Sequence, residues 1–371
     1  MDTNRELAMI LDAVKKFGPR NVSLIARQTG IPRETVRVRL LHQLPKMGFR
    51  VQLVVNYFKL GLTRHFGWLK FSKEHSRMAR DVLNWLGENT YLMYWGHIAL
   101  RNEYLVIATP PVKWEKEFLG IFEEMSDEGI IEDQWFKRVV KYGHPQPSFR
   151  YFDFKKGTWS QTPVTGEELE DEGSDLLIID QVEAREITQY IVDPFDIHIL
   201  VELELDSSAE IVKMAKKLGI HPRVLNYHFN EHVVRKGIVA GYSIGYVPSS
   251  EADRGAGRTW LIVEPAERAL SPLNDLIKEA SKPPVFCQSF NVLEDKTVAL
   301  HYVPTVPTTE FFGSMGRLAD LLVDGAVLPL SESAYYALTY ELFSERGWKN
   351  PMEIEQVKEN LKFLNVVETE S

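Results

Sequence analysis

The sequence predicts an α+β protein built as an internal pseudo-dimer. Each half has a winged-type helix-turn-helix unit followed by a ferredoxin-like βαββαβ domain. Three observations lead to this prediction. A pattern of two short helices around a glycine, residues 25–44, recurs in altered form over residues 214–233. Alternating strand and helix patterns follow each copy, and a polar, acidic segment separates the two halves.

Composition sets the broad class of protein. Apolar residues make up 44% of the 371 residues, enough to fill several cores. The sequence has no apolar run long enough to span a bilayer, and its N-terminus has the pattern of an amphipathic helix rather than a signal peptide. We therefore expect a cytoplasmic protein with no membrane partner. The single cysteine, Cys287, excludes an intramolecular disulfide and a cysteine-cluster metal site.

The first half opens with three predicted helices. Apolar residues at helical spacing predict a helix over residues 6–17, a second from Ser23, which stands at the N-cap position, and a third from Pro32. Val36 and Leu40 begin the apolar stripe of the third helix, and its opposite face is polar and basic. Three short helices with a basic third one indicate a helix-turn-helix unit.

Charge is distributed unevenly along the chain. The net charge of -9 argues against general coating of nucleic acid, because nonspecific affinity comes from neutralised phosphates. Residues 20–50, however, hold seven basic residues against one acidic residue, Glu34. Acidic residues gather instead between Glu167 and Asp175. We interpret that run as a solvated spacer; the alternative is an electrostatic mimic of DNA that covers a basic helix.

After Pro45 the pattern becomes strand, helix, strand, strand, helix, strand. The polar turn Arg101-Asn102-Glu103 between two apolar runs is a hairpin signal. This order is typical of a ferredoxin-like sandwich, with one sheet covered on one face by two helices. The predicted strands cover residues 65–72, 91–100, 104–109 and 134–142, and the helices cover 77–86 and 114–125.

The second half repeats the first at one constant offset over nineteen positions, which relates Gly30 to Gly219 and Gly48 to Gly237. Its predicted helices cover 196–205, 209–218, 222–234, 273–280, 311–322 and a C-terminal stretch from Asn350, and its strands cover 259–264, 285–293, 297–303 and part of 327–341. The patterns divide the chain into a helix-turn-helix domain (1–55), a ferredoxin-like domain (56–150), an acidic linker (151–176), a second helix-turn-helix domain (177–248), a second ferredoxin-like domain (249–345) and a C-terminal helix (346–371).

The run AR-x-x-G-I-P-x-x-x-V-R-x-R-L, residues 26–40, and the run MAK-x-LGI, residues 214–220, resemble the leucine-responsive regulatory protein (Lrp/AsnC) family of transcription regulators, here as a tandem fusion. The resemblance covers most of the chain outside the linker and the C-terminal helix. It implies DNA binding, pairing of the ferredoxin-like sheets into a homo-oligomer, and an amino acid or other small molecule as effector. The stretch from Arg37 to Gly48 is one residue longer than is usual in the family and contains Pro45, so we expect the recognition helix to end early.

A helix presented to the major groove needs long polar side chains for base edges and cations for phosphates. The expected partner is therefore double-stranded DNA. The alternative is a solvated face that pairs with Glu34 or the acidic linker in the first copy, and a packing surface in the second. In the first copy the predicted contact residues are Ser23, Arg33, Glu34, Thr35, Arg37, Arg39 and His42. The equivalent set in the second copy is Arg223, Asn226, Tyr227, His228, Arg235 and Lys236.

The sequence contains only weak signals of metal binding or catalysis. His228 and His232 have the i, i+4 spacing of metal ligands, but Phe229 stands where a zinc protease has glutamate, so we expect no metal and no cofactor. His97 and His301 fall in predicted strands and are expected to be core or cleft groups. No G-x-S-x-G, Walker A or Rossmann glycine motif occurs. We therefore predict no catalytic residue and expect that the chain is not an enzyme.

Two hypotheses for function follow. The first is a sequence-specific transcriptional regulator that reads an asymmetric DNA site with two non-identical helix-turn-helix units. The alternative is an enzyme, because siroheme decarboxylases of the alternative haem pathway resemble this architecture, as paired or fused units in which Arg and His hold a tetrapyrrole carboxylate. The Arg-Arg-x-Gly-Ala-type stretch of those enzymes is missing, since the equivalent place reads Val38-Arg39-Leu40-Leu41-His42.

Overall fold

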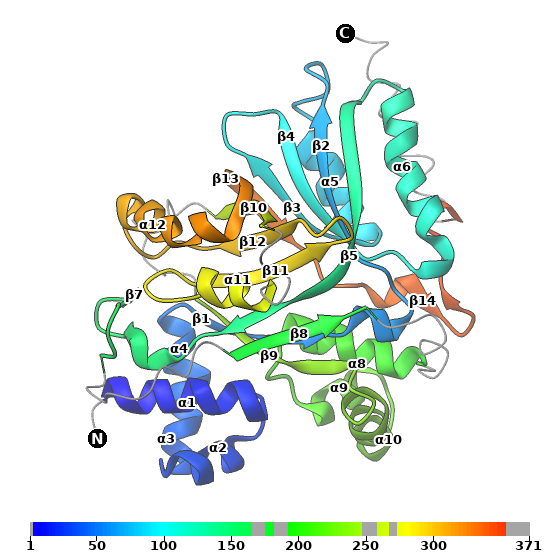
Figure 1. Cartoon of the computed structure of the whole chain (residues 1–371). Coiled ribbons are helices and arrows are strands. Elements are labelled where there is room, and N and C mark those ends of the chain that lie inside the picture. Colours follow the sequence, from blue (N-terminus) through cyan, green and yellow to red (C-terminus); the bar gives the residue numbers. More distant parts are fainter. Residues whose placement is uncertain (1–2, 165–174, 182–191, 247–257, 267–272, 354–371) are drawn as a thin grey trace.

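The computed structural model of the chain describes residues 3–164, 175–181, 192–246, 258–266 and 273–353 (Figure 1). Two small helical units lie side by side at one end, and a large β-structure with helices on its outside occupies the other. The predicted α+β class, with helix-turn-helix units and ferredoxin-like domains in a fused pair, is confirmed. Within the described residues, every helix is too short or too polar to cross a membrane.

The first helical unit consists of α1 (Thr3–Phe17), α2 (Val22–Thr29) and α3 (Arg33–Val38). Gly30 makes the turn between α2 and α3 with φ of +69°, in the left-handed region where glycine has no Cβ to clash. The apolar stripe of the third helix is buried, with Val36 and Leu40 against α1 and α2. The N-cap of α2 is Asn21 rather than the expected Ser23, which lies one residue inside the helix.

The third helix does not end early as expected. It continues as a π-helical turn, Arg39–Gln43, and then as a last α-helical turn, α4 (Leu44–Lys46). The N–H of Leu44 donates to the carbonyl of Arg39, five residues back, so the wider turn takes up the extra residue seen in the sequence. Pro45 then falls in the first turn of α4, where a missing N–H costs little.

The second helical unit has the same design. It consists of α8 (Pro194–Leu205), α9 (Ile211–Lys217) and α10 (Pro222–Tyr227), which continues as a second π-helical segment, His228–Val234. Gly219 makes the turn with φ of +67°, as Gly30 does in the first unit. The two units are tied together by strands that we did not predict, since β1 (Phe49–Val55) pairs antiparallel with β9 (Val239–Tyr246).

The ferredoxin-like domains share one sheet. Its order is β11-β12-β10-β13-β3-β4-β2-β5-β8, and a further pairing of β11 with β5 closes it on itself. Pairs β13–β3 and β5–β11 join the two halves, which makes the chain an internal pseudo-dimer. The strands are β2 (His65–Phe71), β3 (Leu92–Ile98), β4 (Glu103–Ala108), β5 (Ile131–Gln146), β8 (Asp175–Asp180), β10 (Thr259–Pro265), β11 (Cys287–Leu293), β12 (Val298–Tyr302) and β13 (Leu322–Tyr335).

Helices cover the outside of this sheet, and large aromatic residues fill the space between the two halves (Figure 1). Trp260 and Tyr94, one from each half, are both fully buried, and the Trp260 indole N–H donates to the Tyr94 hydroxyl at 2.9 Å. His301, expected to be a core or cleft group, is buried beside them. The covering helices are α5 (Ala79–Asn89), α6 (Glu115–Asp127), α11 (Leu273–Ala280) and α12 (Thr308–Met315).

The segment after β5 is ordered where the sequence predicted a linker. A hairpin of β6 (Phe152–Asp153) and β7 (Thr158–Trp159), together with the turn that precedes it, packs aromatic residues around Phe49 of β1. The acidic run between Glu167 and Asp175 lies almost entirely outside the described residues. After the short pair β14 (Phe343–Ser344) and β15 (Gly347–Trp348), the described chain ends in a single turn, Pro351–Glu353, so the predicted C-terminal helix also lies outside them.

Candidate functional site

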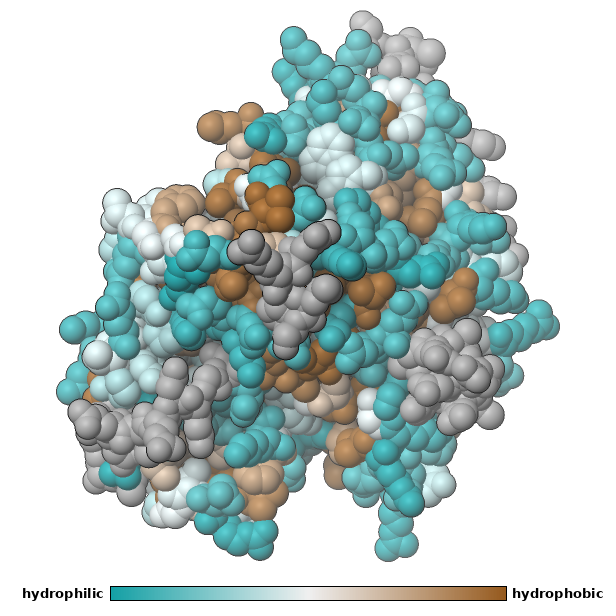
Figure 2. All heavy atoms as spheres, viewed as in Figure 1, coloured by the Kyte–Doolittle hydropathy of each residue, from teal (hydrophilic) through white to brown (hydrophobic). Residues whose placement is uncertain are grey.

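A cleft of about 560 Å³ lies where the end of β2, the β3–β4 hairpin and the approach to α5 meet. We call it the basic cleft. Its walls come mainly from the first half of the chain, and Glu332 of β13 is added from the second half. Figure 2 shows hydrophilic residues over the end of the molecule that carries β2 and β4. Five cationic side chains line the cleft: Lys70, Lys73, Arg77, Arg80 and Arg101.

Part of this positive charge is not compensated. The cleft has two carboxylates, of which Glu132 lies 3.0 Å from Lys70 and Glu332 lies 3.7 Å from Arg80. Arg101 reaches a third carboxylate, Glu103, at 3.3 Å. Two of the lining cations have no carboxylate partner in the described parts of the chain: Lys73 and Arg77.

His97 of β3 lies at the edge of the basic cleft, as expected for a cleft histidine. Both nitrogens of its ring have hydrogen-bond partners. Its Nε2 is 2.7 Å from the carbonyl oxygen of Arg101, and its Nδ1 is 2.6 Å from the Ser331 hydroxyl. Because a carbonyl can only accept, Nε2 carries a hydrogen and donates it to the Arg101 oxygen. The ring also stacks on Tyr104 with centroids 4.8 Å apart.

This arrangement suits a ligand with several carboxylates and an apolar body. Arginine binds carboxylates through paired N–H donors, and lysine adds a compact positive charge. Phe71 and Tyr104, both almost fully buried, form the floor of the same cleft, and His97 supplies a group that can exchange a proton. We did not predict this site from the sequence. The available signal was the spacing of the basic residues three or four apart in Lys70, Lys73, Arg77 and Arg80, followed by the Arg101 hairpin.

The predicted DNA-contact residues of the first copy largely share one surface. Arg37 of α3 pairs with Glu34 at 2.6 Å, and this hydrogen bond lowers the pKa of Glu34. Thr35 of the same helix is half-buried. Five residues of the predicted set are exposed: Ser23, Arg33, Glu34, Arg37 and His42. A depression of about 470 Å³ on this surface is lined by four arginines: Arg20, Arg27, Arg33 and Arg37.

Arg39 does not belong to this surface, contrary to the prediction. Its side chain is 17% exposed and forms an ion pair with Glu6 of α1. The third helix packs on α1 at this point, and the guanidinium compensates a carboxylate that is itself 16% exposed. Arg39 therefore ties two helices together rather than facing solvent.

In the second copy, fewer of the predicted DNA-contact residues are exposed at the surface. His228 is 13% exposed and turned inward toward Asp196, which removes it from the surface. Arg235 pairs with Glu231 at 2.7 Å, and Lys236 is half-buried, with its carbonyl accepting from Lys59. Four residues of the predicted set are exposed: Arg223, Asn226, Tyr227 and Arg235.

The two helix-turn-helix units are held in a fixed relation to each other. The guanidinium of Arg20 in the first unit lies over the ring of Phe229 in the second, 4.0 Å from its centroid. The β1–β9 pair joins the units a second time. On the face shown in Figure 2 a notch separates the lower ends of the two units, where hydrophilic residues lie on both sides and hydrophobic ones are interspersed on the first unit.

No protein-family profile and no curated protein sequence matches the chain. Two solved structures match nearly its whole length. The siroheme decarboxylase NirDL is 13% identical, with a TM-score of 0.57 over 96% of this chain and 99% of that chain. NirDL in complex with an iron-uroporphyrin III analogue is 12% identical over the same shares, also with a TM-score of 0.57. The chain shares the fold of NirDL.

Shorter matches include an AsnC family transcriptional regulator from Agrobacterium tumefaciens, 16% identical, which covers 40% of this chain and 98% of its own, with a TM-score of 0.32. The whole-chain likeness to NirDL contradicts the expectation that the chain is not an enzyme, since that expectation rested on missing motifs and both NirDL structures are of a decarboxylase.

Proposed function

We propose that the chain is an enzyme that binds a carboxylate-rich tetrapyrrole of the siroheme class in the basic cleft and removes carboxyl groups from it. The observation that carries the proposal is the set of five cationic side chains in one cleft, within a fold shared over its whole length with NirDL. The NirDL complex with an iron-uroporphyrin III analogue supports the class of ligand.

The chemistry of the ligand matches the lining of the cleft. Siroheme and uroporphyrins are flat macrocycles whose rims carry acetate and propionate carboxylates. Lys73 and Arg77, which lack carboxylate partners among the described residues, bind two of these rim carboxylates. Phe71 and Tyr104 form the buried floor beneath the edge of the macrocycle. A cleft of about 560 Å³ that is open to solvent holds the edge of such a ligand rather than enclosing all of it.

Decarboxylation breaks the bond between the side-chain methylene and its carboxylate, releases CO₂, and leaves an electron pair on carbon that must take up a proton. His97 is the imidazole among the lining residues, and its hydrogen bonds to Ser331 and to the Arg101 carbonyl hold the ring in place. We assign the proton donation to His97 in its protonated form, which gives up the Nδ1 proton in exchange for its hydrogen bond to Ser331 and regains a proton from solvent between turnovers. The arginines hold the carboxylates that are not removed and thereby orient the one that is.

Titration of the purified chain with iron-uroporphyrin III tests binding, and incubation with siroheme tests turnover. We expect a saturable shift of the Soret band, and product tetrapyrroles that have lost CO₂ by mass spectrometry. A haem with fewer rim carboxylates serves as the control ligand and should bind more weakly. Absence of both a Soret shift and mass loss would refute the proposal, whereas binding without mass loss would refute the enzymatic part alone.

We also propose a second function, DNA binding by the first helix-turn-helix unit. The observation that favours it is the surface formed by Arg20, Arg27, Arg33 and Arg37. The positive charges lie just before α2, in its last turn and along α3, where phosphates and base edges would meet a recognition helix.

Replacing Arg33 and Arg37 together by alanine is expected to weaken binding of duplex DNA by about tenfold or more at fixed salt, and to reduce the salt slope by about two. Gel-shift titration at several salt concentrations measures both quantities. Lys155→Ala with Lys156→Ala removes the same charge from the exposed β6–β7 hairpin and should leave binding unchanged. Equal affinity and equal salt slope in the arginine variant and the wild type would show that this surface does not bind DNA.

A further inference from the structure

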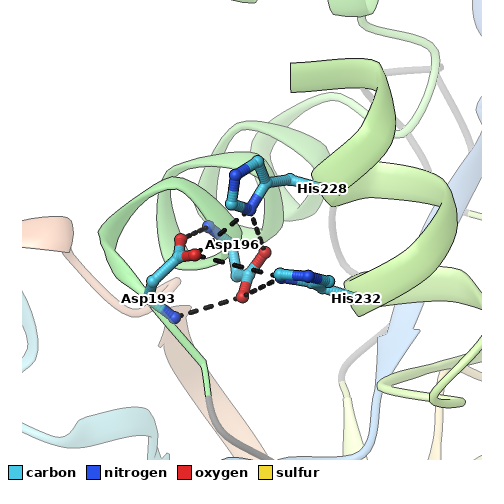
Figure 3. Close-up of side chains that lie close together, drawn as sticks. All are labelled: Asp193, Asp196, His228 and His232. Carbon is cyan, nitrogen blue, oxygen red and sulfur yellow. Dashed lines mark hydrogen bonds and ion pairs between the residues drawn. The ribbon is translucent and has the colours of Figure 1, made fainter. Parts of the chain in front are cut away.

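A cluster of ligand-type side chains joins α8 to the third helix of the second unit (Figure 3). Asp193 and Asp196 come from the start of α8, and His228 and His232 come from the π-helical segment that faces it. One ligand atom from each of the four residues lies within 4.8 Å of the others. The cluster is separate from the basic cleft and takes no part in the function proposed for that cleft.

The four side chains are close enough together to surround one ion, and the two imidazoles meet different oxygens of Asp196. Nδ1 of His228 lies 3.0 Å from Oδ1 of Asp196 and 3.2 Å from Oδ2 of Asp193. Nδ1 of His232 lies 3.2 Å from Oδ2 of Asp196 and 3.9 Å from Oδ2 of Asp193. Four ligands bound tetrahedrally at about 2.0 Å are separated from each other by about 3.3 Å. Small side-chain movements therefore suffice to admit an ion between them.

The carboxylates are positioned by the start of α8 itself. Oδ1 of Asp193 accepts from the N–H groups of Phe195 and Asp196 at 2.9 and 3.1 Å, which leaves Oδ2 directed at the imidazoles. Asp196 has no exposed side-chain surface, and its Oδ2 accepts from the Asp193 N–H at 3.1 Å. This reciprocal capping box fixes both carboxylates before any ion binds.

In the first copy, the residue at the position equivalent to His228 only holds two helices together. The offset that relates Gly30 to Gly219 places Arg39 opposite His228. Arg39 forms one ion pair with Glu6 of α1. The second copy has instead two imidazoles and two carboxylates converging on one point, a donor set that suits zinc and related ions.

We propose that Asp193, Asp196, His228 and His232 bind one divalent transition-metal ion of the zinc class. Both imidazoles coordinate through Nδ1, and each aspartate contributes one oxygen. The ion fastens α8 to the third helix and thereby stabilises the second helix-turn-helix unit. The i, i+4 histidine pair in the sequence, from which we expected no metal, supplies half of the ligands.

The test uses the untagged full-length chain after treatment with EDTA. Titration calorimetry with Zn²⁺ is expected to show one equivalent bound with a micromolar or lower Kd, together with a higher melting temperature. Co²⁺ in place of Zn²⁺ is expected to give the visible absorption bands of a tetrahedral site. The variant His228→Ala with His232→Ala should lose both signals, and His198→Gln, which removes another α8 imidazole outside the cluster, should keep them.

Wild-type protein that takes up no Zn²⁺ and gives no tetrahedral Co²⁺ spectrum would overturn the proposal, and so would a double variant that binds as tightly as the wild type. If the double variant does not fold, His232→Gln provides the comparison, because its ring is the more exposed of the two. We then expect at least a tenfold weaker Kd and an altered Co²⁺ spectrum. None of these outcomes depends on tetrapyrrole or DNA binding.

Discussion

Replacing Lys73 and Arg77 together by glutamate is expected to weaken binding of iron-uroporphyrin III by about a hundredfold or more, equivalent to about 2.7 kcal/mol. These two cations are the ones in the basic cleft without a carboxylate partner among the described residues. Their replacement removes two attractions to rim carboxylates and adds two repulsions. Soret-band titration at low and high salt measures the effect, which should shrink as salt screens the charges.

A matched control separates the cleft from the overall charge of the protein. Lys113→Glu with Lys116→Glu makes the same change of charge at exposed positions at the start of α6, outside the lining of the cleft. We expect this variant to bind nearly as the wild type does. If both double variants lose affinity equally, the attraction is a general effect of charge and the basic cleft is not the binding site.

The local part of the fold was predictable because periodicity is a local property of the sequence. The glycine turns at Gly30 and Gly219 and the order of strands and helices in both halves follow from spacing alone. The closure of the sheet was not predictable. Pairing of β5 with β11, and of β1 with β9, joins segments more than a hundred residues apart, and an apolar strand does not specify its partner.

In the candidate sites, too, the local features were predictable and the features that depend on tertiary packing were not. The exposed face of α3 follows from the helical repeat, and Arg33 and Arg37 lie on the surface. Arg39 and His228 lie at the point where the helix widens into a π turn and packs on a neighbouring helix, which the sequence did not reveal. The basic cleft draws its charges from a strand end, a helix approach and a hairpin, so Arg101 becomes part of it only after folding.

Gly143→Ala is expected to destabilise the chain by about 2–3 kcal/mol, because it forces atoms into a space that is already filled. At this point β5 has β11 on one side, where Gly143 pairs with Phe290, and β8 on the other, where it pairs with Ile178. A Cβ at this position would lie 2.1 Å from the carbonyl oxygen of Leu177 and 2.8 Å from the Phe290 ring. A backbone oxygen in a paired strand cannot move away without breaking the pairing.

The midpoint of urea unfolding measures this loss, and Gly120→Ala is the control. A methyl group added to Gly120 of α6 would meet no neighbouring element within 4 Å in the described parts of the chain, so alanine there should stabilise the helix by up to about 1 kcal/mol. Replacement of glycine by alanine is thus expected to lower the free energy of unfolding at Gly143 and to raise it at Gly120. An unchanged midpoint for Gly143→Ala would show that β8 can separate from β5 without cost. A fall in the midpoint would show that the close packing of β5 between β8 and β11 contributes to the stability of the closed sheet. The two halves of the chain join at this point through β5 and β11.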